Sequence, residues 1–232
     1  MLLTTLLQIT TQTNDLGVQT VSEPTATDSI TLIDLIMKGG IIMIPIFILS
    51  FLAIYIIIER AITIKKATKN TDGLLNQIQP LLKTGDLTRA SASLSAYNTP
   101  ISRMLFKGVQ KIGSPLKQIE ASMEAVGKVE VMKLEKNMSL LGIIAAIAPM
   151  LGFVGTISGV IKIFYNISLA DNISIGLIAG GLYEKMVTSA AGLIVGIIAH
   201  TGYHYLNMMI ENVVLRLETT SLEFIDVISE EK

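Results

Sequence analysis

The sequence contains no cysteine, and charged residues make up only 16% of it. The absence of cysteine excludes disulfide bonds, thiolate catalysis and cysteine-based zinc sites. Soluble domains carry about 25% charged residues, so the low charge indicates an integral membrane protein, in line with a mean hydropathy of +0.59. The patterns GxxxxGKS/T, GxSxG and HExxH are missing as well. We therefore expect no enzymatic activity, no cofactor, no bound metal and no nucleic-acid partner.

Three apolar segments are long enough to cross a bilayer. The first is residues 41–58, which include Pro45, the second is residues 138–161, and the third lies on both sides of Glu184. A helix rises 1.5 Å per residue, so each segment covers a hydrocarbon core about 30 Å thick once flanking residues are included. The predicted fold class is all-α, an integral membrane protein with three transmembrane helices, the second and third of which extend far into the cytoplasm.

Lysine and arginine are distributed unequally around these segments, which predicts their orientation. They outnumber acidic residues between positions 59 and 137, directly after the first segment and before the second. The stretch 162–171, between the second and third segments, holds almost none. The positive-inside rule then places residues 59–137 and the C-terminal tail in the cytoplasm. We expect a multi-pass membrane protein whose N-terminus lies outside the cytoplasm.

These patterns also give the expected organisation of the chain. Residues 1–32 form an extracytoplasmic segment, with a short amphipathic helix favoured over a cleaved signal peptide, followed by a tether rich in Ser, Thr and Pro. The other expected parts are transmembrane helix 1 (33–59), a cytoplasmic helical insertion (60–137), transmembrane helix 2 (138–165), a periplasmic loop (166–172), transmembrane helix 3 (173–203) and a cytoplasmic amphipathic helix (204–232).

Turn signals divide the insertion into helices. Gly85-Asp86 and Asn98-Thr99-Pro100 predict turns, and Gly113-Ser114-Pro115 predicts a break before a helix with Ser114 as N-cap and Pro115 at its first position. No breaker follows until Pro149, so we predict one helix from about residue 115 to 165.

Apolar residues of the tail continue at spacings of four and three, which predicts that the third transmembrane helix extends as an amphipathic helix. Its stripe consists of Leu206, Ile210, Val213, Leu217, Ser221, Phe224 and Ile228. Such a stripe needs a partner that covers it.

Small residues recur in the second and third segments, where they let membrane helices approach closely. Gly155 and Gly159 form a GxxxG pair in the second segment, and the third has two further pairs, Gly176/Gly180 and Gly192/Gly196. Two interpretations stay open, namely packing inside one three-helix subunit and contact between subunits of an oligomer.

Glu184 and Lys185 are charged residues inside an otherwise apolar segment. A charge at the centre of a bilayer costs about 2.5–3.5 kcal/mol on insertion scales, so it indicates function. Thr156 and Ser189 are further polar side chains near the middle of the membrane. Their hydroxyls either bond back to their own helices or line a polar path together with Glu184. A Glu184–Lys185 pair between neighbouring helices or subunits is the structural alternative.

His200 and His204 lie four residues apart, with Glu211 near the same helix face. This spacing can hold a metal. Because no cysteine or supporting polar pattern accompanies them, an interfacial role is the favoured interpretation of the histidines.

At these residues the chain resembles the MotA/TolQ/ExbB proton-channel family, and within it is most like ExbB. Residues 148–159 (APMLGFVGTISG) resemble the family's AP-x-x-G-x-x-GT-x-x-G, and residues 184–192 (EKMVTSAAG) resemble its Glu-Ala-Leu-x-x-Thr-Ala-x-Gly. The resemblance covers most of residues 33–210. The chain departs from the family in having Ser189 for threonine, Lys185 for a small or apolar residue, and Ile198 where proline is frequent.

The resemblance implies a ring-forming homo-oligomer, a pentamer, whose second and third helices surround a pore. An ExbD/TolR-like single-span protein would lie inside it, and a TonB/TolA-like protein would receive the energy. It assigns Thr156, Glu184 and Ser189 to the ion pathway. Its packing and pore-shape positions are Pro149, Gly152, Gly155, Gly159, Gly192 and Gly196.

The implied location is a bacterial inner membrane, with the N-terminus in the periplasm. The implied function is an ion-conducting stator subunit, with the proton as the expected ion, that drives outer-membrane active import. Three alternatives stay open: a TolQ-like motor for envelope maintenance, a non-conducting membrane scaffold in which Glu184 and Lys185 only fix helix register, and a metal or small-molecule carrier that uses His200, His204 and Glu184.

Overall fold

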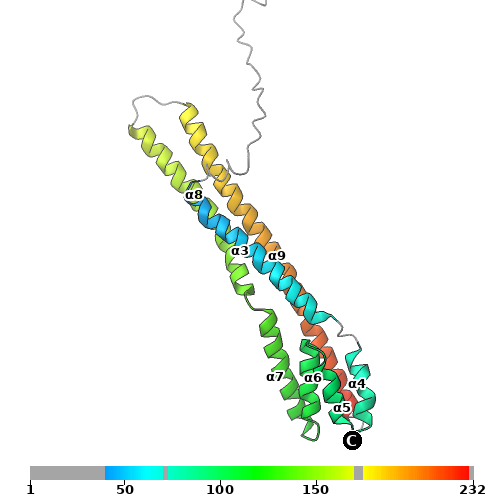
Figure 1. Ribbon diagram of the computed structural model, residues 1–232. Helices are drawn as coiled ribbons and strands as arrows, with labels where there is room; N and C mark the ends of the chain where they lie inside the picture. The colour runs from blue at the N-terminus through cyan, green and yellow to red at the C-terminus, as the bar shows by residue number, and fades with distance from the viewer. Residues whose placement is uncertain (1–39, 70–72, 170–174, 230–232) are drawn as a thin grey trace, which may run out of the picture. The chain divides into compact units, whose positions relative to one another are not determined.

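The computed structural model describes residues 40–69, 73–169 and 175–229, all within the unit formed by Lys38–Lys232. Every regular element in these ranges is an α-helix (Figure 1). In chain order the helices are α3 (Met43–Thr68), α4 (Leu74–Lys83), α5 (Leu87–Ser95), α6 (Pro100–Gln110), α7 (Leu116–Leu134), α8 (Met138–Leu169) and α9 (Ile175–Ser229). The predicted amphipathic helix and tether of residues 1–32 lie outside the described residues.

Three stretches of helix, in α3, α8 and α9, are long and apolar enough to cross a membrane. The most apolar window of α3 is only 22% buried, so most of its apolar side chains face outward, where lipid can cover them. α3 and α9 run in the same direction and α8 runs in the opposite one (Figure 1). The all-α prediction with three membrane-spanning helices is confirmed.

The predicted continuous helix from about residue 115 to 165 is wrong, because the chain breaks between α7 and α8. Asn137 has a φ of 64°, in the left-handed region, and the Met138 N–H donates to the Glu135 carbonyl at 3.0 Å. Asparagine tolerates this conformation better than most residues with a side chain, so the break needed neither glycine nor proline. At the far end, residues 166–169, expected in the loop, are still helical.

α9 continues from the third membrane-spanning segment into the tail as one helix of 55 residues, as predicted. The core of the tail's apolar stripe is almost completely buried, at most 4% exposed, in Leu206, Ile210, Val213, Leu217 and Phe224. The insertion helices cover this stripe, with α4, α6 and α7 all packed on α9. The partner that the stripe needs is therefore the chain's own insertion.

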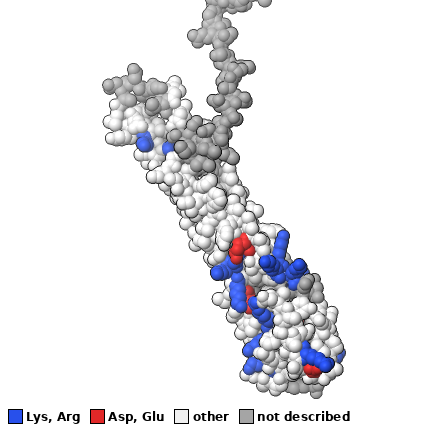
Figure 2. All heavy atoms as spheres, viewed as in Figure 1, with Lys and Arg blue, Asp and Glu red and all other residues white. Residues whose placement is uncertain are grey.

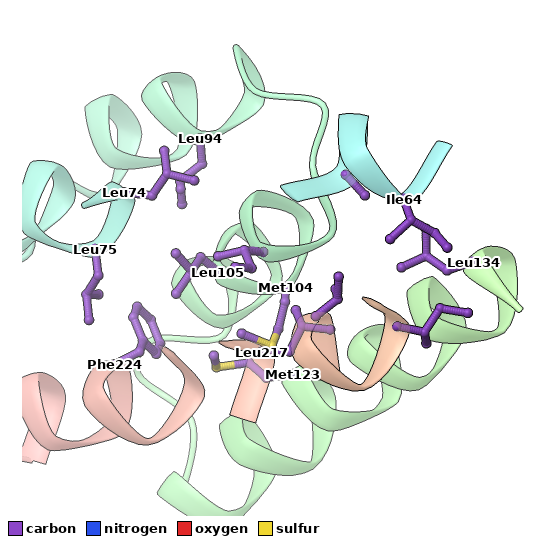
Figure 3. Close-up of a cluster of buried hydrophobic side chains, with 14 of the residues drawn as sticks. Ile64, Leu74, Leu75, Leu94, Met104, Leu105, Met123, Leu134, Leu217 and Phe224 are labelled. Atoms are coloured by element: carbon purple, nitrogen blue, oxygen red, sulfur yellow. The ribbon is translucent and has the colours of Figure 1, made fainter. Parts of the chain in front are cut away.

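The centre of this core lies where α6, α7 and α9 meet. Figure 3 shows Phe224 and Leu217 of α9 near Met104 and Met123 of α6 and α7. Gly108 of α6 permits the approach, since a Cβ there would lie 2.6 Å from both the Met123 sulfur and the Phe224 ring. The insertion and the tail thus form one packed helical bundle.

Two predicted turns of the insertion are confirmed. Gly85 has a φ of 71°, and the Asp86 carboxylate caps α5 by accepting from the Arg89 N–H at 3.0 Å. Thr99 caps α6 and forms a reciprocal capping box with Ser102.

The predicted cap of α7 is wrong by one residue. Pro115, with an extended ψ of 140°, is the N-cap, and it makes no side-chain cap bond. Ser114 instead belongs to the preceding turn, where its N–H donates to the Lys111 carbonyl at 3.0 Å. The residue before a proline avoids the helical region, which places Ser114 outside the helix.

Candidate functional site

The helices that carry the expected pore residues, α8 and α9, pack on each other in antiparallel directions. Their contacts run from Gly142 against Tyr203 at one end to Ile163 against Gly181 at the other. Near the middle, a Cβ added to Gly192 would lie 2.6 Å from the carbonyl oxygen of Ala148. Only glycine leaves room for so close an approach of two backbones.

Other small residues of the expected packing set lie in the same α8–α9 interface. The close pairs there are Gly152 with Ser189, Gly155 with Thr188, and Gly196 with Pro149. Gly176 and Gly180 behave differently, because both are exposed and a Cβ at Gly180 would meet no described atom within 4 Å. Except for this pair, the glycine pairs serve packing inside one subunit, the first of the two interpretations left open by the sequence.

Thr156 joins the two helices through its hydroxyl. The Thr156 Oγ1 donates to the Gly152 carbonyl of its own helix at 3.1 Å and to the Lys185 carbonyl of α9 at 3.4 Å. One hydrogen shared between two acceptors is a three-centre bond. The bond to Gly152 agrees with the interpretation in which this hydroxyl bonds back to its own helix. The polar path shared with Glu184 stays a prediction.

Lys185 directs its side chain along α8. A Cβ at Gly159 would overlap the Cγ, Cδ and Cε carbons of Lys185, and a Cβ at Gly40 would lie 3.6 Å from its Nζ. The aliphatic stem thus lies on the bare backbone of Gly159 while the ammonium group approaches the segment that precedes α3. Glu184 occupies the preceding position of α9, but its side chain lies outside the described part of the structure, so its pairing stays a prediction.

Sequence reasoning missed Thr188, the most buried hydroxyl of the α8–α9 interface. Thr188 is only 1% exposed, and its Cγ2 would lie 3.0 Å from a Cβ at Gly155. Ser189, the predicted pore residue, is half-buried, and its backbone packs against Gly152. The spacing of Lys185, Thr188 and Gly192, three and then four residues apart, was the signal that places Thr188 on the interface.

In the described residues the two histidines and Glu211 do not gather into one group of ligands. The rings of His200 and His204 stack edge to face at 4.5 Å between centroids, and both residues are exposed. The Glu211 carboxylate instead accepts from the Asn207 amide at 2.8 Å. Within the described residues no group of three potential ligands gathers. The Glu184 side chain, the third group of the carrier alternative, lies outside them.

A network of charged residues lies where α3 leaves its apolar segment. Arg60, which is 5% exposed, pairs with Glu59 and donates to the Lys133 carbonyl at 3.1 Å. Glu130 is also buried and accepts from Arg103 and from Lys133, each at 2.5 Å. The network connects α3, α6 and α7. Sequence reasoning missed it, because the bonds that connect different helices join residues far apart in the chain, Arg60 with Lys133 and Arg103 with Glu130.

Comparison with known proteins gives the family of this helical arrangement. The model of the MotA/TolQ/ExbB proton channel family matches residues 96–219, which include Thr156, Glu184 and Ser189. This range covers more than half of the chain and contains the whole α8–α9 interface.

Individual relatives agree with the family match. The putative biopolymer transport protein ExbB-like 1 of Synechocystis sp. is 26% identical over 208 residues, covering 86% of this chain and 77% of that protein. An ExbB homolog of Methanothermobacter thermautotrophicus is 25% identical over 190 residues, covering 81% and 67%. The biopolymer transport protein ExbB of Neisseria meningitidis is 26% identical over 192 residues, covering 73% and 84%. With its three membrane-spanning helices and the motifs of its second and third segments, the chain belongs to the MotA/TolQ/ExbB proton channel family.

Proposed function

We propose that this chain is the proton-conducting stator subunit of an inner-membrane complex that couples the proton-motive force to mechanical work on a partner protein. Family membership and three membrane-spanning helices support this role. Several relatives carry the name biopolymer transport protein ExbB, which supports active import across the outer membrane as the driven process. A TolQ-like role in envelope maintenance is the alternative process.

The position of the Thr156 hydroxyl is the observation that carries the proposal. It lies in the α8–α9 interface and reaches the Lys185 carbonyl across it. A hydroxyl both donates and accepts, so it can exchange its partner for a carboxylate that moves past. One elementary charge crossing 100 mV releases about 2.3 kcal/mol. This energy is larger than the net contribution of a typical hydrogen bond, about 1 kcal/mol. The membrane potential can therefore drive the exchange of hydrogen-bond partners in one direction.

We further propose that Thr156, Glu184 and Ser189 line the pore of a homopentamer with an ExbD/TolR-like helix inside and a TonB/TolA-like protein as the receiver of energy. Most of the glycines pack in the α8–α9 interface inside one subunit. The contacts between subunits are therefore made by the apolar side chains of α8 and α9 that are exposed in the single chain. Phe153 is 63% exposed on α8 and Ile197 is 65% exposed on α9.

Proton flux in liposomes that contain the chain and its single-span partner tests the proposal. An internal pH-sensitive dye reports the flux under an imposed membrane potential. Thr156→Val keeps the shape of the side chain and removes the hydroxyl, so most of the flux should be lost. Thr156→Ser keeps the hydroxyl and should retain flux. Stability should change little, because hydrogen bonds between membrane helices average about 0.6 kcal/mol.

A non-conducting scaffold is the second candidate, favoured by the bond of Thr156 to its own helix and by the glycine packing. A scaffold predicts that Thr156→Val is harmless and that Glu184→Gln lowers the yield of oligomer, because Lys185 of a neighbouring helix loses a partner. Normal flux in Thr156→Val at normal expression would contradict the channel role of this residue.

A further inference from the structure

A hollow lies between the end of α3 and the middle of α9. It has a volume of about 600 Å³ and is lined by Lys65, Thr68, Lys69, Met209, Asn212 and Arg216. Three of its six lining residues are cationic, and none is acidic. Figure 2 shows Lys and Arg side chains gathered at the lower end of α3, below a band with few charges. The hollow therefore suits an anion.

The face of α3 changes character at the hollow. Ile58 and Ile62 are 55% and 50% exposed. Lys65 follows at a spacing of three on the same helix face, and Lys69 is the C-cap residue directly after the helix. Lys65 lies two turns, about 10.5 Å, beyond Ile58, and its long side chain leans back toward the N-terminal end of the helix. Its ammonium group can therefore extend to the headgroup layer, which spans roughly 5–8 Å beyond the hydrocarbon core.

The side of α9 that faces α3 also changes from exposed apolar residues to polar and cationic ones beside the hollow. Tyr205 and Met208 are 55% and 58% exposed. Asn212 and Arg216 continue this face at spacings of four and line the hollow. The two helices run in parallel and approach closely just before it, where a Cβ at Gly202 would overlap the Ile57 side chain. The exposed apolar faces of α3 and α9 thus lie side by side, and both end at the same cationic hollow.

From this arrangement we propose that the hollow binds the phosphate of an anionic phospholipid, whose acyl chains lie along the exposed apolar faces of α3 and α9. A soluble phosphate would use the cationic groups but would leave the apolar stripes without a role, which favours the lipid. Lys65 and Lys69 supply the charge. Arg216 need not be without a protein partner, because a guanidinium has five N–H donors and binds two acceptors at once.

Lipid titration of the detergent-solubilised full chain, followed by native mass spectrometry, tests the proposal. Phosphatidylglycerol and phosphatidylcholine with identical acyl chains separate the headgroup charge from the tails, and inorganic phosphate represents the soluble source. We expect phosphatidylglycerol to bind more tightly than the other two. A lysine near an anionic surface is worth about fivefold in affinity, so Lys65→Gln with Lys69→Gln should weaken binding about thirtyfold.

Two matched double variants complete the test. Lys83→Gln with Lys117→Gln removes the same charge from exposed positions away from the hollow, and should leave the affinity unchanged. Lys65→Arg with Lys69→Arg keeps both charges in place and should bind phosphatidylglycerol like the wild type.

Four results would overturn the proposal. These are equal binding of the two lipids by the wild type, inorganic phosphate binding as tightly as phosphatidylglycerol, unchanged affinity in the glutamine variant, and an equal loss in the Lys83/Lys117 control. If the glutamine variant does not fold, the wild-type preference between the lipids and the arginine variant decide the question.

Discussion

Arg103 and Glu130 form an ion pair whose two members differ strongly in exposure. The Glu130 side chain is 5% exposed, while that of Arg103 is 43% exposed. The carboxylate therefore depends on its protein partners, whereas water solvates much of the guanidinium. This difference determines which member of the pair is harder to replace.

We predict that Arg103→Met destabilises the fold more than Glu130→Gln. Removing Arg103 leaves a buried carboxylate with only Lys133, and a weakly compensated buried charge costs several kcal/mol at most. Glu130→Gln leaves cations that water can reach, so its cost should be roughly 1–2 kcal/mol, near that of a lost charged hydrogen bond. Equilibrium unfolding in mild detergent measures both. Glu124→Gln, which affects an exposed pair with Lys128, is the control. A larger effect of Glu130→Gln would contradict this account.

Gly159→Leu should separate α8 from α9, because its side chain would need the space that the stem of Lys185 occupies. Overpacking of this kind costs about 1–3 kcal/mol. Gly180→Leu is the matched control, since a Cβ there meets no described atom within 4 Å. Thermal unfolding followed by circular dichroism compares the two variants. Equal midpoints would show that Lys185 moves aside without loss.

Phe224→Ala should loosen the bundle of insertion and tail. The ring is completely buried, and the cavity it leaves costs about 3–5 kcal/mol. Leu222→Ala on the same helix is the control, because Leu222 is 64% exposed and surface changes stay within about 0.5 kcal/mol. Limited proteolysis of the loops between α4 and α7 reports the loosening. If the two variants are cleaved at the same rate, the core does not hold the insertion on α9.

The proposed orientation is testable with single cysteines, since the wild-type chain has none. Ala92 is exposed on α5, and a cysteine there should be shielded from an impermeant maleimide in intact cells. A cysteine at position 22 should be labelled. Permeabilised cells provide the control in which both react. Labelling at position 92 alone would invert the topology.

The sequence was sufficient where one chemical pattern decided the structure. Apolar length predicted the three membrane-spanning helices, and the spacing of residues such as Leu206 and Phe224 predicted a continuous α9. Gly85-Asp86 predicted a turn because few other residues suit that backbone. In each case the decisive residues are neighbours in sequence or lie on one helix face.

The sequence was insufficient where contacts between residues far apart in the chain determine the structure. The stripe of α9 required a partner, but its periodicity is the same whether a second subunit or the chain's own insertion covers it. The burial of Glu130 has no local signal in the sequence, because it depends on Arg103 from another helix. Asn137 carries no strong breaker signal, so the end of α7 escaped prediction.

The two connections between membrane and insertion differ in how they transmit motion. α9 is unbroken over 55 residues, about 82 Å at 1.5 Å per residue, far longer than the membrane it crosses. A tilt or rotation of its membrane end therefore reaches Phe224 without a hinge to absorb it. The path through α8 and α7 contains the non-helical turn at Asn137, which interrupts the helix and offers a place to bend. We therefore expect a movement of α9 in the bilayer to reach the insertion directly, and a movement of α8 to be partly absorbed at the turn around Asn137.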